Sequence, residues 1–444
     1  MIDFDHNATT PLDSRVRAAM IELLGDPTLD GNPSSVHGRG RAARAVLEGA
    51  RRTLAAVLDA EPLGITFTSG GTEADALAIL GSCRALRAAG RPCALLTTKI
   101  EHPAVLGAGE RLQREGIDHV FVEVDERGRL APEQVVAALE SHPEVGLVSL
   151  AAANHELGNC YDIPAIVQAI RSSHSIRRPI LIHSDAVQAF GKRPVSFAGW
   201  GVDLLSVSSH KIHGPKGVGA LIHRPHHQLE PLWIGGSQER GRRVGTEALP
   251  IIHGFAVAAQ LVDEELEQRR HHFASLRERL LAGLRERVPD AIVHGDLEHN
   301  LGNTVLVSIP ECSGELLLMN LDLEGIAVST GSACNSGKLG GSKVLLALGV
   351  DPRLASCALR ISLGKDNQAA DVDRLLELLP GIVARVRANG FELFQAAPST
   401  EGSRPPLGAP RADANHEPAH RGSEATDRPR SGRSVAHTKA ITGG

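Results

Sequence analysis

The sequence predicts an α/β fold, with a large domain built on a mostly parallel β-sheet and a smaller α+β domain. From about Leu12 to Val257, short apolar runs alternate with stretches of helical periodicity, as in strands joined by crossover helices. A second set of strand-like and helical stretches follows, up to about residue 395. With 444 residues, the chain is long enough for two such domains and a substantial core.

The individual elements follow from the hydrophobic pattern. In the first part, strand-like runs cover 64–68, 93–97, 120–124, 145–150, 180–183 and 204–207, and helical patterns cover 41–58 and 132–142. Residues 257–288 have the pattern of one long amphipathic helix, typical of a connector with a solvated face. In the second part, 303–309 and 358–364 favour strands and 371–390 favours a helix. Residues 396–444 contain almost no large apolar side chains, which predicts a disordered tail.

Composition excludes several classes of protein. A net charge of −5 gives no reason to expect nucleic acid or an anionic membrane as a partner. No apolar run reaches the roughly 20 residues of a membrane span, and the N-terminus lacks the pattern of a secretory signal, so we expect a cytoplasmic protein. The six cysteines have no CxxC spacing, which argues against a metal ribbon or a redox pair, and we expect no metal site.

Three local patterns suggest chemistry. Lys211 follows an apolar run within a stretch rich in small and turn-forming residues, where it could form a Schiff base or could simply be solvated. Asp185 follows the apolar run 180–183, where it could pair with a pyridinium nitrogen or could cap a helix. Upstream, 65–79 reads as strand, glycine-rich turn and helix, a geometry that presents backbone N–H groups to a phosphate.

These patterns belong to a longer series of motifs. The series comprises Asp5-His-Asn-Ala-Thr-Thr-Pro11, Asn32-Pro-Ser-Ser-Val-His37, Thr68-Ser-Gly-Gly-Thr-Glu73, Glu101-His102, Asp185 with Gln188, Ser208-Ser-His-Lys211, Gly235 with Arg243-Val-Gly-Thr246, Ser332-Ala-Cys334-Asn-Ser-Gly and Leu359-Arg-Ile-Ser-Leu-Gly364. With it, the chain resembles the cysteine desulfurases, pyridoxal-phosphate (PLP) enzymes of the class V aminotransferase group. The resemblance runs from Asp3 to about Gly364 and continues more weakly to about residue 395. It implies a fold-type-I PLP-dependent transferase that converts L-cysteine to L-alanine.

The resemblance also implies a role for each site residue. Lys211 would bind the cofactor as a Schiff base and move the Cα proton, Asp185 would pair with the pyridine nitrogen, and Gln188 would contact the ring hydroxyl. His102 would stack on the ring and take part in proton transfer. Arg360 would hold the substrate carboxylate with its planar guanidinium. The phosphate would be bound by Gly71, Thr72, Ser208 and His210, together with Thr246 from the partner subunit.

Cys334 would be the nucleophile that takes up the sulfur as a persulfide. It lies in a glycine- and serine-rich stretch, which suits a mobile loop; the alternative is a free surface thiol. Attack requires the thiolate, so a nearby base such as His102 must assist. The length of the loop resembles the branch that supplies iron–sulfur cluster assembly and tRNA thiolation, which implies a sulfur-acceptor protein as partner.

The chain departs from the family pattern at several positions. His155 stands where the family usually has an asparagine that contacts cofactor and substrate, and an imidazole is bulkier and ordinarily titrates near neutrality. Asn7 stands where alanine or serine is common, Ala76 where asparagine is common, and Lys343 where histidine or tyrosine is common.

Taken together, we expect a large cofactor-binding domain over 12–261 and a small domain combining 1–11 with 262–395. We expect a homodimer, because Thr246 would complete the neighbouring phosphate site. Two alternatives stay open: a selenocysteine lyase or other PLP-dependent C–S lyase, and a scaffold that keeps the fold without turnover.

Overall fold

The computed structural model of the chain describes residues 1–330 and 341–395. Cys334 and the tail at 396–444 lie outside the described residues, so the predictions for them stay predictions.

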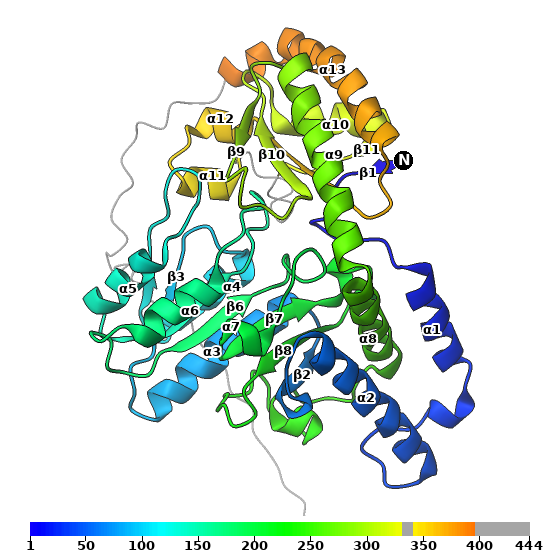
Figure 1. Cartoon of the computed structure of the whole chain (residues 1–444), viewed down its shortest axis with the longest axis vertical. Helices are drawn as coiled ribbons and strands as arrows, with labels where there is room; N and C mark the ends of the chain where they lie inside the picture. The colour runs from blue at the N-terminus through cyan, green and yellow to red at the C-terminus, as the bar shows by residue number, and fades with distance from the viewer. Residues whose placement is uncertain (331–340, 396–444) are drawn as a thin grey trace, which may run out of the picture. The chain divides into compact units, whose positions relative to one another are not determined.

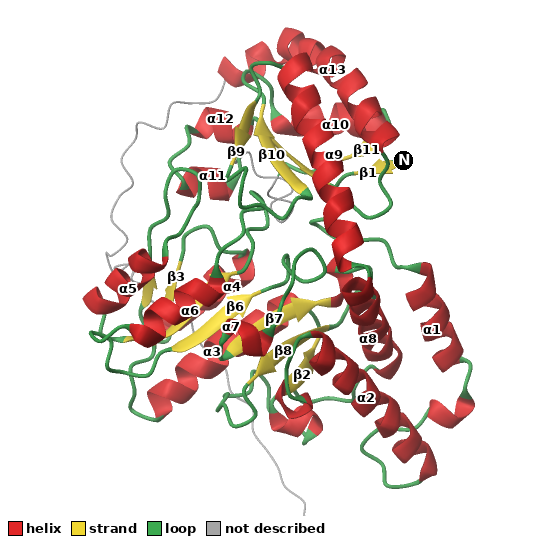
Figure 2. Cartoon of the chain, in the orientation of Figure 1, coloured by secondary structure: helices red, strands yellow, loops and turns green. Residues whose placement is uncertain are grey.

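A seven-stranded sheet forms the centre of the larger part (Figures 1 and 2). Its order is β2-β8-β7-β6-β5-β3-β4. The strands are β2 (Ile65–Thr68), β3 (Ala94–Thr97), β4 (His119–Phe121), β5 (Val145–Ala151), β6 (Leu181–Asp185), β7 (Leu204–Ser208) and β8 (Gly219–His223). Only β8 runs antiparallel to its neighbours, so the other six strands share one direction, which confirms the mostly parallel α/β sheet. The strand β8 was not predicted.

Successive residues of the strands face opposite layers of helices. Leu95, Leu147, Leu204 and Leu221 belong to one hydrophobic cluster with α3 (Gly71–Ala88) and α4 (Pro103–Arg114). Their neighbours Leu96, Val148, Leu205 and Ile222 belong to the cluster on the other face. That face is covered by α2 (Gly38–Val57), α5 (Pro132–Ser141), α6 (Ile163–Ser172), α7 (Phe197–Trp200) and α8 (Leu249–Glu264). Burial on both faces explains why the strands read as continuous apolar runs.

A second hydrophobic core lies in the upper part of Figure 1. Its antiparallel sheet has the order β12-β10-β9, and β1 pairs with β11 in parallel. The strands are β1 (Ile2–Asp3), β9 (Ile292–His294), β10 (Thr304–Ser308), β11 (Ile326–Ala327) and β12 (Ala358–Ser362). Its helices are α9 (Leu266–Arg287), α10 (Gly314–Leu323) and α13 (Ala369–Gln395). The short helices α11 (Lys343–Ala347) and α12 (Pro352–Ser356) instead contribute Val344, Leu345 and Ala355 to the cluster of the large sheet. The domain boundaries at 11/12 and 261/262 stay a prediction.

The single long helix predicted over 257–288 is wrong. Two helices, α8 and α9, meet at Glu265, whose φ of −100° and ψ of 3° leave the helical region. Helix α9 buries Phe273, Leu276, Leu280 and Leu284 in the second core, as the apolar face of an amphipathic helix does. The apolar side chains gave no sign of the break, since their spacing continues across it.

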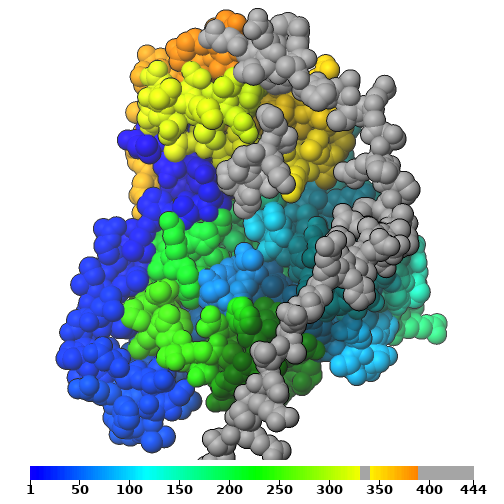
Figure 3. All heavy atoms as spheres, turned by 180° about the vertical axis from the view of Figure 1, so that it is seen from behind, coloured from blue at the N-terminus to red at the C-terminus, as the bar shows by residue number. Residues whose placement is uncertain are grey.

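The N-terminal residues connect the two parts. Asp13 begins the helix α1 (Ser14–Leu24) by accepting a hydrogen bond from the backbone N–H of Arg15. Seen from behind, the N-terminal segment lies against the yellow residues of the upper part and continues down the side of the molecule (Figure 3). No helix in the described part of the chain is long and apolar enough to cross a membrane.

Candidate active site

A cavity of about 230 Å³ lies beside the carboxyl ends of β5, β6 and β7. Parallel strands end at the same edge of a sheet, which is where ligands bind in open α/β folds. Its lining includes nine of the sequence-predicted site residues: Gly71, Thr72, His102, His155, Asp185, Gln188, Ser208, His210 and Lys211. The fold therefore brings together residues up to 140 positions apart in the chain.

Lys211 and Asp185 share this cavity although Asp185 ends β6 and Lys211 lies in the turn that follows β7. The Nζ of Lys211 donates to the backbone carbonyls of Asn7 (2.5 Å) and Ala8 (2.9 Å). Asp185 ends β6, and its Oδ1 accepts a hydrogen bond of 2.9 Å from the backbone N–H of Val187. Burial raises the pKa of Asp185 to about 6, an effect that this hydrogen bond and the charge of Lys211 reduce. At pH 7.5 the carboxylate is thus mainly ionised and able to hold a proton at a ring nitrogen.

The other end of the cavity is suited to a phosphate. Gly71 begins α3, so backbone N–H groups and the positive end of the helix dipole face the cavity there. A Cβ on Gly71 would come within 2.7 Å of Cγ2 of Val187, so only glycine allows the close approach. The hydroxyl of Ser208 is buried and makes no hydrogen bond with the described residues, which leaves it a donor for an oxyanion.

His102 and His155 face each other edge to face at one side of the cavity, with ring centroids 5.1 Å apart. The Nδ1 of His102 accepts a hydrogen bond of 3.1 Å from the backbone N–H of Ala104, so a neutral ring carries its proton on Nε2. Burial lowers the pKa of His102 to about 4, and the charges of Lys211 and Arg360 add to the lowering. Burial likewise lowers the pKa of His155 well below its usual range. Burial thus moves the pKa of His155 away from the near-neutral range that is ordinary for an imidazole.

Arg360 lies on β12 next to the cavity, although it is not among the lining residues. Its Nη2 donates to Oδ1 of Asp5 at 2.7 Å and its Nη1 donates to the carbonyl of His155 at 3.2 Å. The Nε of Arg360 is buried and makes no hydrogen bond with the described residues. A carboxylate arriving from the cavity would thus meet a guanidinium that Asp5 already holds.

Ser329 and Ser342, which lie close in sequence to the two ends of 331–340, both make hydrogen bonds to residues of this site. Ser329 pairs with Arg360 through two backbone hydrogen bonds, of 3.1 and 2.6 Å. On the far side, the hydroxyl of Ser342 donates to the carboxylate of Glu156, the neighbour of His155.

One predicted residue lies elsewhere. Thr246 is exposed and is not among the residues that line the cavity. It follows Trp233 and Ile234, which are 51% and 100% exposed in the single chain. The ring of Trp233 lies 6.0 Å from the guanidinium carbon of Arg243.

Three residues at the site were not predicted from the sequence. Asp75 lines the cavity one helical turn after Gly71, and that spacing of four residues was a usable signal. Asn7, noted only as a departure from the family, contacts Lys211, Gln188 and His155. Lys192 is buried behind Gln188, and only the scarcity of lysine could have pointed to it.

Comparison with known proteins places this site in a family. The model of the family "Aminotransferase class-V" matches residues 2–375. A cysteine desulfurase of Cereibacter sphaeroides is 43% identical, over 86% of this chain and 96% of the relative, and one of Gluconacetobacter diazotrophicus is 40% identical, over 86% and 93%. Among solved structures, a NifS-like protein has a TM-score of 0.79 and 37% identity, covering 86% of this chain and 99% of its own.

The chain belongs to the class-V aminotransferase family, among the cysteine desulfurases. This family is PLP-dependent. The cavity fits that cofactor, because it offers a lysine for the aldehyde, a carboxylate for the ring nitrogen, and a helix N-terminus with an unpartnered hydroxyl for the phosphate. The fold-type-I expectation is confirmed as well, since a NifS-like protein from Rickettsia africae has a TM-score of 0.76 at 30% identity, covering 86% of this chain and 99% of its own.

Proposed function

We propose that this chain is a PLP-dependent cysteine desulfurase, which converts L-cysteine to L-alanine and transfers the sulfur to Cys334. The observation that carries the proposal is one cavity that holds Lys211, Asp185 and His102 at the carboxyl edge of the sheet. It occurs in a chain that is 40% identical to a named cysteine desulfurase over most of its length.

When bound, PLP withdraws electrons from the Cα of the substrate, which makes the Cα proton acidic. Asp185 holds a proton at the ring nitrogen and so favours this withdrawal. The amine of Lys211 moves the Cα proton, and the carbonyls of Asn7 and Ala8 hold that amine in place beforehand. Gly71, Thr72, Ser208 and His210 bind the phosphate and fix the position of the ring.

The substrate is oriented by Arg360 and by the two histidines. Arg360 binds the carboxylate of L-cysteine, for which its fork of N–H donors is suited. His102 is neutral and carries its proton on Nε2, so it can donate that proton and afterwards accept another at physiological pH. His155 is also neutral and stands where the family usually has an asparagine. A neutral imidazole has one N–H donor and an asparagine amide has two, so His155 can donate fewer hydrogen bonds to the substrate.

The sulfur is transferred when the thiolate of Cys334 attacks the substrate sulfur. The bond between Cβ and sulfur breaks and a bond between the two sulfurs forms. One enzyme thiol and one L-cysteine thus yield an enzyme persulfide and L-alanine without an external oxidant. The pairing of Ser329 with Arg360 supports this role, because it holds a residue five positions before Cys334 in the sequence at the arginine that would bind the substrate carboxylate.

The persulfide would pass to a sulfur-acceptor protein, a scaffold or carrier, in the cytoplasm. We propose iron–sulfur cluster assembly, or thiolation of tRNA or a cofactor, as the use of this sulfur. A relative from Methanosarcina thermophila, 39% identical over 86% of this chain and 92% of its own length, is named cysteine desulfurase IscS.

The enzyme would act as a homodimer in which Thr246 of the partner subunit completes the phosphate site. The exposure of Thr246, Trp233 and Ile234 in one segment supports this proposal. Mixing an inactive Lys211→Ala subunit with a Thr246→Ala subunit tests it. If Thr246 serves the neighbouring site, mixed dimers contain one site that lacks both residues and one that is intact, so activity should be partly restored.

The decisive experiment is L-alanine and sulfide release from L-cysteine with a reductant, comparing the native protein with Cys334→Ala. Turnover by the native protein alone supports the desulfurase and the nucleophile. Turnover of L-selenocysteine by both proteins would favour the selenocysteine lyase instead. Absence of turnover and of visible cofactor absorbance would favour a scaffold.

A further inference from the structure

Lys192 is a buried lysine immediately behind the cavity. It is 5% exposed, and its Nζ donates to two amide oxygens, Oε1 of Gln188 at 2.7 Å and Oδ1 of Asn7 at 3.3 Å. Within the described residues, no carboxylate forms an ion pair with Lys192. A buried cation without a counter-ion costs stability, so its presence calls for a task.

That task is visible in the orientation of Gln188. An ammonium group only donates hydrogen bonds, so it holds the amide of Gln188 with Oε1 toward Lys192 and excludes the flipped orientation. The Nε2 of Gln188 therefore points away from Lys192, and it donates to the backbone carbonyl of Asn7 at 3.0 Å. The amide nitrogen has a second N–H, and because Gln188 lines the cavity this N–H can serve an acceptor bound there.

Asn7 completes the arrangement. Its Oδ1 also accepts from Nδ2 of Asn303 at 3.1 Å, while its own Nδ2 donates to Thr304 at 2.9 Å. These two hydrogen bonds fix the side-chain amide of Asn7 with its Oδ1 toward Lys192. An alanine at position 7 would leave Lys192 with Gln188 as its main acceptor.

We propose that Lys192, supported by Asn7, is a positioning residue that orients the amide of Gln188 so that its Nε2 donates to the ring oxygen of the cofactor. The inference rests on the proposed function, since it requires PLP in the cavity. Burial, with the charges of Lys211 and Arg360, lowers the pKa of Lys192 to about 7. Below that pH the ammonium only donates; above it the neutral amine still donates but also has a lone pair, so its hold on Gln188 is strictest at the acidic end of the range.

The test measures PLP affinity of the apoprotein and the pKa obtained from the visible absorbance of the lysine-bound cofactor between pH 6 and 9. A donor to the ring oxygen stabilises the negative charge on that oxygen. The nitrogen that joins Lys211 to the cofactor then loses its proton more easily, so removing the donor raises the pKa of this nitrogen. We expect Lys192→Met to raise it by about 0.5 to 1 unit and to weaken PLP binding about 5-fold. Lys192→Gln, which keeps a donor without the charge, should stay within about 2-fold of the native affinity.

Gln188→Ala separates positioning from charge. If Lys192 acts through Gln188, the shift caused by Lys192→Met disappears in the Gln188→Ala background. A shift that persists there, or a shift in Lys192→Gln equal to that in Lys192→Met, overturns the inference and leaves only an effect of charge. Lys99→Met, at an exposed lysine, is the matched control and should change neither readout.

Asn7→Ala serves as a second variant if Lys192→Met does not fold. It should shift the same pKa in the same direction by a smaller amount, again only when Gln188 is present; no shift would contradict the proposal. Failure of the native protein to bind PLP would refute the proposed function itself. Native binding with unshifted variants would refute only the role of Lys192.

Discussion

Two carboxyl groups in the cavity, Asp75 and Asp185, differ in their protonation. Burial and then the charge of Asp185 raise the pKa of Asp75 well above its usual range, and its Oδ1 makes no hydrogen bond with the described residues. Asp185 is also buried, but the N–H of Val187 and the charge of Lys211 favour its ionised form. The two carboxyl groups thus differ in what their surroundings favour: those of Asp75 favour the protonated form, whereas Val187 and Lys211 favour the ionised form of Asp185.

This difference predicts that replacing each carboxyl group by an amide changes kcat by very different amounts. Asp75→Asn replaces a neutral acid by a neutral amide of the same shape, and we expect kcat for L-cysteine to change by less than about 3-fold. Asp185→Asn removes the charge that holds a proton at the ring nitrogen, and we expect kcat to fall by about 100-fold or more. Steady-state L-alanine release measures both, and equal losses in the two variants would refute the assignment.

Among the elements, the N-terminal segment has the widest influence on the site. Asn7 and Ala8 hold Lys211, and Asp5 holds Arg360. The hydroxyl of Thr10 donates to the carbonyl of His210 and accepts from the N–H of His213, on either side of Lys211. This segment, residues 1–13, contains only the two-residue strand β1, yet it contacts both β12 and the loop around Lys211 at the edge of the large sheet.

Asp5 should compete with the substrate for Arg360. Asp5→Asn weakens the existing partner of the guanidinium, so the carboxylate of L-cysteine should bind more tightly and KM should fall about 3- to 10-fold with kcat nearly unchanged. Asp3→Asn is the matched control, because Asp3 is hydrogen-bonded to the backbone of Asp5 and makes no bond to Arg360. An unchanged or higher KM in Asp5→Asn would show that Asp5 instead positions Arg360 for the substrate.

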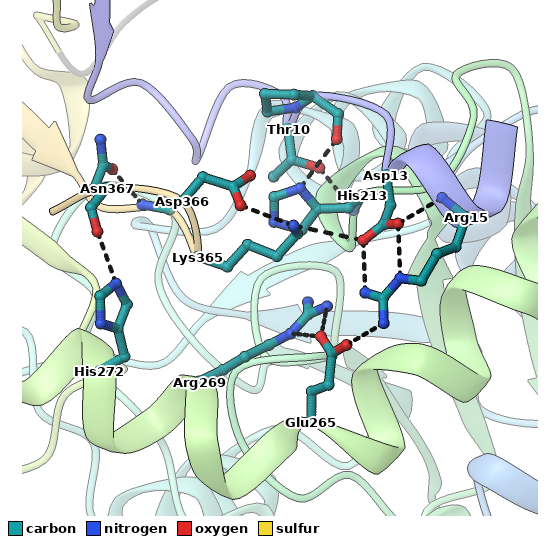
Figure 4. A network of polar contacts seen from close by, with 12 residues as sticks. Thr10, Asp13, Arg15, His213, Glu265, Arg269, His272, Lys365, Asp366 and Asn367 are labelled. Atoms are coloured by element: carbon teal, nitrogen blue, oxygen red, sulfur yellow. Dashed lines mark hydrogen bonds and ion pairs between the residues drawn. The ribbon is translucent and has the colours of Figure 1, made fainter.

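The junction of α8 and α9 is a second element-scale feature (Figure 4). Glu265 binds Arg15 and Arg269, each at 2.6 Å, and Arg15 in turn binds Asp13 at 2.8 Å. Lys365, in the loop after β12, lies 3.5 Å from the same Asp13. A short ionic chain thus links the N-terminal segment, the helix junction and the loop that follows Arg360.

Neutralising Glu265 should therefore loosen the junction. We expect Glu265→Gln to lower the free energy of unfolding by about 1–2 kcal/mol, because Arg269 is nearly buried and would lose its partner. Glu267→Gln changes a side chain that is 65% exposed, and its effect should be close to zero. Urea denaturation at low and high salt compares the two; similar small effects would contradict the role of the junction.

At the scale of the whole molecule, many histidines are buried in their neutral form. Burial lowers the pKa of His102, His119, His210, His223 and His294 to about 4, and that of His183 and His213 to about 3. In the unfolded chain each would titrate at about 6.5. Between these values the unfolded state binds more protons than the folded one, so stability is full above pH 6.5 and falls as the pH drops toward 4.

Each of these histidines should add up to about 1.4 kcal/mol per pH unit to that loss. His183→Asn should therefore reduce the slope of unfolding free energy against pH between 6.5 and 4.5. His299→Gln should leave the slope unchanged, since the side chain of His299 is 74% exposed. Urea denaturation at several pH values measures the slope; a slope unaffected by His183→Asn would mean that this ring is already protonated in the folded state.

Much of the fold could be predicted because each strand of the large sheet is buried on both faces and leaves a continuous apolar run. Strand β8 was missed because its sequence contains Gly219 and ends at a histidine. The helix break at Glu265 was missed because it depends on contacts with Arg15 and Arg269, distant or charged residues that do not alter the apolar spacing.

The sequence by itself determined the family, the cofactor chemistry and the main residues of the cavity, because motifs with fixed spacing encode the turns at the ends of consecutive strands. Only the tertiary structure decided how these groups are tuned. The neutral state of His155, the pairing of Arg360 with Asp5, and the hold of Lys192 on Gln188 all depend on burial and on neighbours 4 to 355 residues away. Desolvation and hydrogen bonding act through space, and no local pattern in the chain records them.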